Sequence, residues 1–193
     1  MKHFKSKIIF VLALTLLAST CEPKPGETKN IITVITAAIK NVTLEVKGSG
    51  DMTIDWGDGS AIDTVTLSDT TIISRHHDYA YEKANKITIT GNVTYLYSNY
   101  NNVTNLDITK TTVITTLYCG NNRISSLDAG KCKALKYLDC SDNSFSTTAL
   151  DELFGTLPMS SIVKTVEIFS NPGCEDCDRS IAQKKGWYVG DCW

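Results

Sequence analysis

The sequence predicts a mainly β chain, in which a small β-sandwich is followed by a short repeat solenoid and a partly helical C-terminal cap. Two observations carry this prediction. Leu96, Leu117 and Leu138 lie 21 residues apart, and solenoid repeats recur at periods of about 20 to 29 residues. Upstream of them, runs rich in β-branched residues alternate with turn signals, as the strands of a small sheet do.

Other columns of the sequence keep the same 21-residue step and so fix one register for the repeat. They are Val93–Ile114–Leu135, Ser98–Cys119–Cys140, Asn101–Asn122–Asn143 and Val103–Ile124–Phe145. Because side chains alternate along a strand, the leucine and the cysteine of each repeat point the same way, into the core. The asparagine follows where the chain turns and is placed to hydrogen-bond the backbone there.

The middle repeat, Ile114-x-x-Leu117-x-Cys119-x-x-Asn122-x-Ile124-x-x-Leu127, resembles the short bacterial form of the leucine-rich repeat. The resemblance covers residues 92–150 and implies stacked strands with a ladder of asparagines. Thr148 stands where Leu106 and Leu127 stand in the earlier repeats, so the third repeat is less regular.

The segment 31–91 contains the expected strands of the sandwich, including Ile31–Val34, Val42–Val46 and Ile87–Thr90. Within it, Trp56-Gly57-Asp58-Gly59 is followed by His77-x-Tyr79 and then by a terminal strand. This order and spacing resemble a PKD-type immunoglobulin-like domain, and in that family pattern the histidine is structural. A calcium site at Asp51, Asp55 and Asp58 is the alternative, but their spacing does not match an alternating acidic loop.

The N-terminus has the pattern of an exported protein. Residues 1–20 contain three early lysines and a short apolar run, which is typical of a signal peptide. Leu17-Ala18-Ser19-Thr20-Cys21 resembles a bacterial lipoprotein cleavage box and implies lipidation of Cys21; a plain secreted protein is the alternative. Residues 21–30 have the composition of a tether.

The C-terminal part, residues 151–193, is expected to hold an atypical last repeat and a cysteine-containing cap. Residues 148–155 predict a short amphipathic helix with a threonine cap and Gly155 as its stop. The strand Val163–Ile168 followed by Asn171 predicts a fourth repeat, and a second helical stretch is expected from Asp178 to Lys185.

A structural disulfide from Cys174 or Cys177 to Cys192 is favoured over a zinc or redox site, because further ligands or a βαβ context are lacking. Cys119 and Cys140 are expected to remain free thiols in the core.

The strand positions between the buried leucines are predicted to form an exposed face. It would hold Thr116, with Tyr100 at its edge, and the ligand-binding candidates Tyr95, Tyr97, Tyr118, Tyr137 and Asp139. A tyrosine ring with its polar tip suits recognition of a protein or a glycan. The alternative is that these tyrosines only stabilise the sheet.

No catalytic site emerges from the sequence, since we find no nucleophile with a base, no paired carboxylates in a defined context and no phosphate-binding glycine loop. No cofactor or metal is expected, and a net charge of -2 without a basic stripe argues against nucleic acid.

We therefore expect a non-catalytic binding or adhesion module, anchored by Cys21 in a bacterial envelope. Its expected place is the outer membrane, at the periplasmic face or the cell surface. The resemblances suggest a lipoprotein of Bacteroidetes type, and the alternative is a structural spacer or accessory subunit of an envelope complex.

Overall fold

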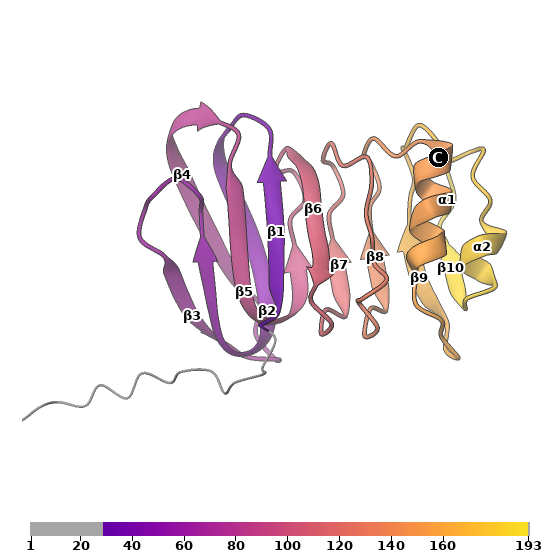
Figure 1. The fold of residues 1–193 in the computed structure, drawn as a ribbon, viewed down its shortest axis with the longest axis horizontal. Helices are drawn as coiled ribbons and strands as arrows, with labels where there is room; N and C mark the ends of the chain where they lie inside the picture. Colours follow the sequence, from indigo (N-terminus) through magenta and orange to yellow (C-terminus); the bar gives the residue numbers. More distant parts are fainter. Residues whose placement is uncertain (1–28, 193) are drawn as a thin grey trace, which may run out of the picture.

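A computed structural model describes residues 29–192 (Figure 1). The predicted signal peptide, the lipidation site Cys21 and most of the predicted tether lie outside these residues. Within the described part of the chain, the helices are too short or too polar to cross a membrane.

The N-terminal region consists of long, mostly antiparallel strands, and the predicted strands at its two ends and in its middle are confirmed. The elements are β1 (Ile31–Thr36), β2 (Ile39–Asp55), β3 (Asp63–Leu67), β4 (Ile73–Lys83) and β5 (Lys86–Tyr97). The first half of β2 pairs with β4 and its second half with β3, while β5 pairs along its other side. Valine, leucine and isoleucine alternate along β2 and β5 and supply the core.

Strand β5 joins the N-terminal region to the repeats. Its first half pairs antiparallel with β1, and its last residues, Tyr95–Tyr97, pair in parallel with β7 (Thr116–Tyr118). The two halves meet at Gly91, whose φ of 143° is rarely open to other residues. The strand therefore crosses the predicted boundary between residues 91 and 92, and the buried side chains on both sides of it form one core.

The repeats stack as parallel strands, each pairing in register with the next. From β5 the sheet continues through β7, β8 (Tyr137–Asp139), β9 (Lys164–Glu167) and β10 (Trp187–Val189). Leu96, Leu117 and Leu138 align in this register and are completely buried. The fourth strand predicted around residues 163–168 is confirmed as β9, whereas β10 was not anticipated because the insertion of α1 takes it out of the 21-residue step.

The back of the first repeat is also a strand, which the sequence did not predict. Strand β6 (Val103–Lys110) pairs antiparallel with β1. Its residues are largely polar, and three of them, Val103, Leu106 and Ile108, are buried in the core. The open edge of β1 supplies backbone partners to β6, so tertiary pairing produces a strand that local pattern alone does not indicate.

A ladder of asparagines holds the turn after each repeat strand. The Asn143 amide nitrogen donates to the carbonyl oxygens of Cys119, Cys140 and Ser141 at 2.9 to 3.2 Å, and its oxygen accepts from Ile124 N at 2.8 Å. Asn122 and Asn171 make the same kind of contacts. Each amide thus links two successive repeats and satisfies backbone groups that the sheet leaves free.

The first asparagine of the column faces the N-terminal region instead of another repeat. Asn101 accepts a hydrogen bond from Thr43 N at 3.0 Å and donates to Thr43 O at 2.7 Å. These two bonds connect the ladder directly to β2. The same column therefore serves both the repeats and their junction with the N-terminal region.

A second ladder runs through the inward column of Ser98, Cys119 and Cys140. Each side chain donates to a carbonyl oxygen of the next strand, from Ser98 to Tyr118, from Cys119 to Asp139 and from Cys140 to Glu167. Both cysteines are free thiols, as expected, and burial raises the pKa of each. They act as small core residues rather than as reactive groups.

Helix α1 (Thr147–Thr156) covers the core side of the last repeats, where it buries Leu150, Leu153 and Phe154 (Figure 1). Both the N-cap and the stop residue predicted for this helix are wrong. Ser146 is the N-cap, with its side chain accepting from Ala149 N, because it precedes the threonines and has the extended backbone that a cap requires. Gly155 lies within the helix, which ends before Pro158.

The C-terminal cap is held by Trp187 and by one disulfide. Helix α2 (Ser180–Gln183) is shorter than predicted and leads into β10. The indole nitrogen of Trp187 donates to Pro158 O at 2.9 Å, and Lys164 lies over its ring at 5.3 Å from the centroid. Cys174 is bonded to Cys192, while Cys177 remains a free, half-buried thiol.

We predict that Asn143→Ala lowers the free energy of unfolding by about 3 kcal/mol, because it removes one acceptor and leaves buried carbonyl groups without donors. Denaturant titration followed by circular dichroism measures this. Asn41→Ala, at an exposed position of β2, is the matched control and should change stability by less than about 0.5 kcal/mol. Equal behaviour of the two variants would contradict the role of the ladder.

Removing the disulfide in a Cys174→Ala/Cys192→Ala variant should also destabilise the protein. The bond closes a loop of sequence separation 18, for which the chain-entropy relation gives about 3 kcal/mol. Thermal unfolding without reductant measures the loss, and Cys177→Ala is the control. If reductant leaves the unfolding temperature of the parent unchanged, the disulfide does not stabilise the protein.

Candidate functional site

The outward side of the parallel strands carries two rows of side chains, which we call the tyrosine face. Strand register sets one row as Tyr95, Thr116, Tyr137, Thr165 and Tyr188, and the other as Tyr97, Tyr118, Asp139 and Glu167. On β2, Lys47 and Glu45 pair with Tyr95 and Tyr97 and extend the two rows. The leucines between these positions point into the core, so alternation along each short strand produces the face.

Four tyrosine rings form a continuous cluster on this face. Tyr118 lies at its centre, with ring centroids 5.7 Å from Tyr95, 5.8 Å from Tyr97 and 5.0 Å from Tyr137. The planes are tilted by 42° to 54°, an arrangement that aromatic pairs favour. All four side chains are partly exposed, so each ring is fixed by its neighbours and still has a free side.

Tyr100 stands at the edge of the cluster and is far more exposed, at 70%. Its φ of 60° places it in the left-handed region at the end of β5, and its backbone nitrogen donates to Asn121 O. The ring therefore projects beside the cluster rather than packing in it.

The phenols of Tyr95, Tyr97 and Tyr137 stay protonated at neutral pH. Partial burial, with Asp139 adding to it, raises the pKa of Tyr137 to about 12. Burial and the nearby Glu45 also raise the pKa of Tyr95, and burial raises that of Tyr97. This half of the face presents neutral rings and hydroxyl groups that can both donate and accept hydrogen bonds.

The other half of the face is acidic. Asp139 accepts from the Ser141 backbone nitrogen at 3.0 Å and from its hydroxyl. Partial burial, together with Asp139 and Asp191, raises the pKa of Glu167. Among the salt bridges of residues 29–192, Asp191 pairs with Arg179, but neither Asp139 nor Glu167 has a basic partner. From β5 to β9, the row that begins at Tyr97 thus changes from aromatic to anionic.

The structure brings together all five ligand-binding candidates of the sequence analysis, and it adds three that were missed. Thr165, Glu167 and Tyr188 join the rows because β9 and β10 continue the register. The insertion of α1 before β9 breaks the 21-residue step, so periodicity could not place these residues. The alternation in Trp187-Tyr188-Val189 was the available signal for β10.

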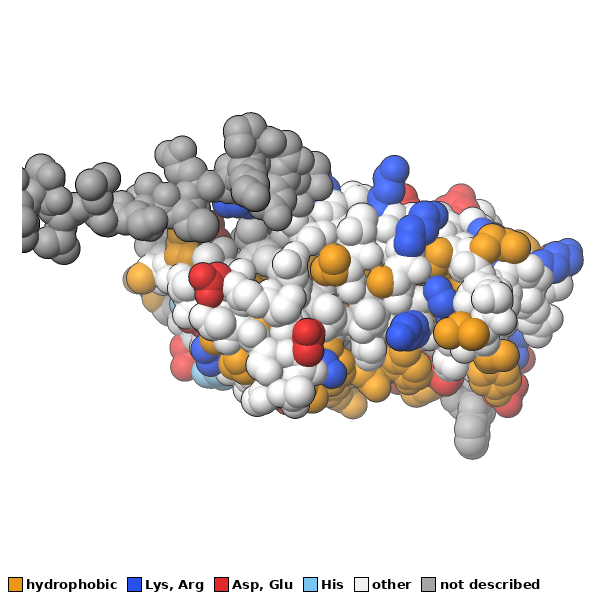
Figure 2. All heavy atoms as spheres, turned by 90° about the horizontal axis from the view of Figure 1, so that it is seen from below, with side chains coloured by type: hydrophobic (Ala, Val, Ile, Leu, Met, Phe, Trp, Pro, Cys, Tyr) orange, Lys and Arg blue, Asp and Glu red, His pale blue; other side chains and the backbone are white. Residues whose placement is uncertain are grey.

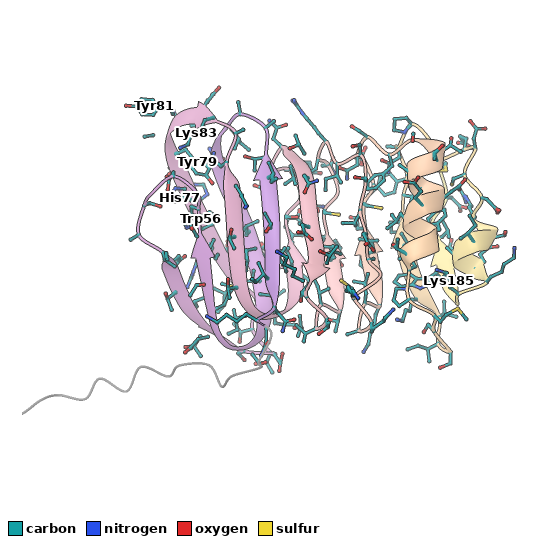
Figure 3. All side chains as sticks on the ribbon, in the orientation of Figure 1. Trp56, His77, Tyr79, Tyr81, Lys83 and Lys185 are labelled. Carbon is teal, nitrogen blue, oxygen red and sulfur yellow. A yellow bond between two sulfur atoms is a disulfide. The ribbon has the colours of Figure 1, made fainter. Side chains whose placement is uncertain are left out.

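A second cluster of polar and aromatic groups lies at the far end of the N-terminal region (Figure 3). The rings of Trp56 and His77 stack with centroids 4.9 Å apart and an interplanar angle of 7°. His77 Nε2 lies 2.8 Å from Asp58 Oδ2, and the Tyr79 hydroxyl donates to Trp56 O at 3.0 Å. The cluster therefore ties the Trp56–Gly59 turn to β4.

This cluster has the form of an Asp–His pair but serves packing. Within residues 29–192, no hydroxyl or thiol hydrogen-bonds to His77, so a nucleophile that the pair might activate is missing there. Gly57 completes the turn, since a Cβ at this position would lie 2.2 Å from Lys86 O. The described residues also hold no group of three or more side chains arranged to bind a metal ion.

On the core side, away from the tyrosine face, an open hollow of about 490 Å³ lies between β6 and α1. Its lining includes the carboxylates of Asp107, Asp128 and Glu152. Most of the lining residues are polar and half of them are exposed, so this hollow lacks the apolar walls of a typical small-molecule site.

Comparison with protein families agrees with the repeat geometry. Residues 112–154 match the family model described as Leucine Rich repeats (2 copies). These residues form leucine-rich repeats. They include β7, β8 and most of α1, and thus the centre of the tyrosine face. Comparisons with curated proteins and with solved structures gave no match.

We predict a pH-dependent effect of Asp58→Asn on stability. Hydrogen bonds from Ser60, and then the contact with His77, hold the pKa of Asp58 well below its usual range. A lowered folded-state pKa contributes stability above the unfolded value of about 4, and this stability is lost as pH falls through the folded value.

At pH 7 the free energy of unfolding of the variant should therefore be lower than that of the parent by about 1 to 2 kcal/mol. This difference should become smaller as the pH falls below about 4. Urea unfolding at pH 7, 4 and 2.5 measures it. Asp69→Asn, at an exposed turn, is the control. A gap that stays constant across this range would show that ionisation of Asp58 is not the cause.

Proposed function

We propose that this protein is a non-catalytic binding module that holds a protein ligand on the tyrosine face of its leucine-rich repeats. The observation that carries the proposal is the cluster of four partly exposed tyrosines centred on Tyr118, beside the carboxylates of Asp139 and Glu167. Leucine-rich repeats commonly mediate protein interaction, which is consistent with this assignment.

The rings are suited to recognition because binding would cost them little conformational freedom. Each is already fixed by a neighbour about 5 to 6 Å away, so few rotamers are lost on binding. Tyrosine is also among the residues that contribute most at interfaces. A glycan is the other ligand that such rings suit, but their mutual tilt offers less flat area for stacking on a sugar.

The acidic half of the face favours a partner with a lysine or arginine beside its apolar contacts. Asp139 and Glu167 have no basic partner within the described residues, so a cation from outside would gain a charge-assisted hydrogen bond. The same cation could contact a neighbouring tyrosine ring. One side chain of the ligand could then bridge the two halves of the face.

We further propose that the protein works at a bacterial envelope, anchored through a lipid on Cys21. The support is the sequence around Cys21 and the tether composition that follows it. The N-terminal region is proposed to be a PKD-like β-domain, a proposal supported by the Trp56–His77–Tyr79 contacts. Combined with leucine-rich repeats, these features resemble surface lipoproteins of Bacteroidetes-type bacteria and suggest a role in adhesion or nutrient capture.

A structural spacer or accessory subunit is the second candidate function. It is favoured by one observation, that the tyrosines contact each other across the strands, and such contacts stabilise a sheet without any ligand. A spacer would tolerate loss of the rings in every binding assay and would lose only stability.

The test compares Tyr97→Ala/Tyr118→Ala with the parent in affinity capture from envelope extracts and on a glycan array. We expect a stoichiometric protein partner whose affinity falls by about 2 kcal/mol or more, roughly thirtyfold, in the variant. Tyr81→Ala is the control, because Tyr81 is 79% exposed on β4 and does not belong to the face.

A cooperative thermal unfolding transition in each variant is the check that both variants fold. A sugar signal that the double variant abolishes would assign a glycan ligand instead. Binding that is indifferent to both tyrosines would contradict the tyrosine-face proposal and leave the spacer.

A further inference from the structure

The loops that enter the parallel strands carry charge of one sign. Because the strands are parallel, these loops all lie along one edge of the sheet. They span residues 110–115, 131–136, 157–163 and 184–186, and their ionisable residues are Lys110, Lys131, Lys133, Lys136, Lys184 and Lys185, with no aspartate or glutamate. We call this the lysine edge. The loops that leave the strands differ, since they contain Asp142 and Asp191 as well as Arg123.

The lysine edge is open to solvent. The side chains of Lys110, Lys131, Lys133 and Lys136 are exposed, and none of them belongs to a salt bridge among the described residues. Seen from below, the repeat half of the molecule gathers blue side chains with orange ones among them (Figure 2). Positive charge is therefore concentrated on this edge, although the net charge of the whole chain is -2.

An exposed apolar loop lies on the same edge. Met159, Ile162 and Val163, just before β9, are 73%, 61% and 80% exposed. Contiguous exposed apolar side chains mark interaction surfaces in soluble proteins. A single exposed apolar residue would need no explanation. Three such residues within five positions, on the same edge as the lysines, indicate a surface with a function.

The backbone holds this apolar loop in place. Ser160 N donates to Lys185 O at 2.9 Å, and the Ser160 hydroxyl donates to Ile162 O at 2.7 Å. At the start of the loop, Pro158 O accepts from the indole of Trp187 and Leu157 O accepts from the Lys185 amine. The three apolar side chains are thus presented by a loop that connects α1 to β9 and is anchored to Lys185 and Trp187 of the C-terminal cap.

The start of the described chain lies on this edge as well. Lys29 and Ile31, the first residue of β1, line one open hollow of about 630 Å³ together with Lys110 and Lys131. Figure 1 shows β1 starting at the lower end of the sheet. Any tether that precedes residue 29 therefore leaves the folded part of the protein at the lysine edge.

We propose that the lysine edge docks on an anionic membrane surface, with its lysines at the phosphate-bearing headgroups and Met159, Ile162 and Val163 in the interface. Basic residues are attracted to anionic lipid, and exposed apolar side chains gain by entering the headgroup boundary. A nucleic acid would use the lysines but not the aliphatic side chains, so the combination favours a bilayer. In this orientation the strands rise from the membrane, and the tyrosine face is open sideways.

Sedimentation with lipid vesicles tests the proposal. The full-length chain with Cys21→Ser is used, so that lipid attachment does not contribute, and residues 1–28 are identical in every variant. Vesicles of phosphatidylcholine alone are compared with vesicles that contain about 30% phosphatidylglycerol, a composition that gives a negative surface. Binding should be stronger to the anionic vesicles and should weaken as salt is raised.

Lys133→Gln/Lys136→Gln should reduce binding to anionic vesicles by about 25-fold, since each lysine near such a surface is worth roughly fivefold in affinity. Met159→Ser/Ile162→Ser/Val163→Ser should reduce it by about tenfold or more, because three apolar side chains no longer enter the headgroup boundary. The matched control is Ile62→Ser/Ile72→Ser, two exposed positions in loops of the N-terminal region, and it should bind as the parent does. Tyr97→Ala/Tyr118→Ala should also bind vesicles normally, which separates this proposal from the function of the tyrosine face.

A second measurement locates the contact. Val163→Trp places an indole on the apolar loop, and brominated lipid should quench its fluorescence, whereas Ile72→Trp should be unaffected. The proposal is overturned if the lysine and loop variants bind vesicles as the parent does, or if quenching is equal at the two positions. Binding to a DNA duplex without binding to vesicles would also overturn it.

Discussion

The backbone at the end of each repeat strand must turn away from the sheet, and this turn leaves carbonyl and amide groups without partners. Asn122, Asn143 and Asn171 satisfy these groups with side-chain amides that are themselves shielded by the stack. Buried polar groups without such partners would be costly. The spacing of the strands, and with it the tyrosine face, depends on the same asparagine contacts being made in each repeat. Asn101 extends the asparagine ladder into the N-terminal region.

The two surfaces of functional interest follow from the same stacking. Parallel strands in register align every outward residue into rows and every entry loop along one edge. The rows produce a face that is aromatic near β5 and anionic toward β9, and the edge collects lysines. Neither surface needs a deep pocket. The proposed recognition would be spread over several short strands, as expected for a partner that is itself large.

Sequence reasoning located the tyrosine face because Leu96, Leu117 and Leu138 fixed which side of each strand is buried. It also found the asparagine ladder and the fourth strand. It missed β6, whose polar sequence becomes a strand only beside the open edge of β1. It also missed β10 and Tyr188, because the helical insertion of α1 separates them from the 21-residue step. The helix cap at Ser146 and the choice of Cys174 over Cys177 depend on local geometry that periodicity does not contain.

Strand β1 also has a mechanical consequence. It lies between β5 and β6 and is hydrogen-bonded antiparallel to both. A force that pulls on the chain at Lys29, along the axis of β1, would load both rows of hydrogen bonds in shear, all at once, rather than unzip them one by one. The strand nearest Lys29 is therefore also the one clamped on two sides, which would suit the anchoring proposed at Cys21.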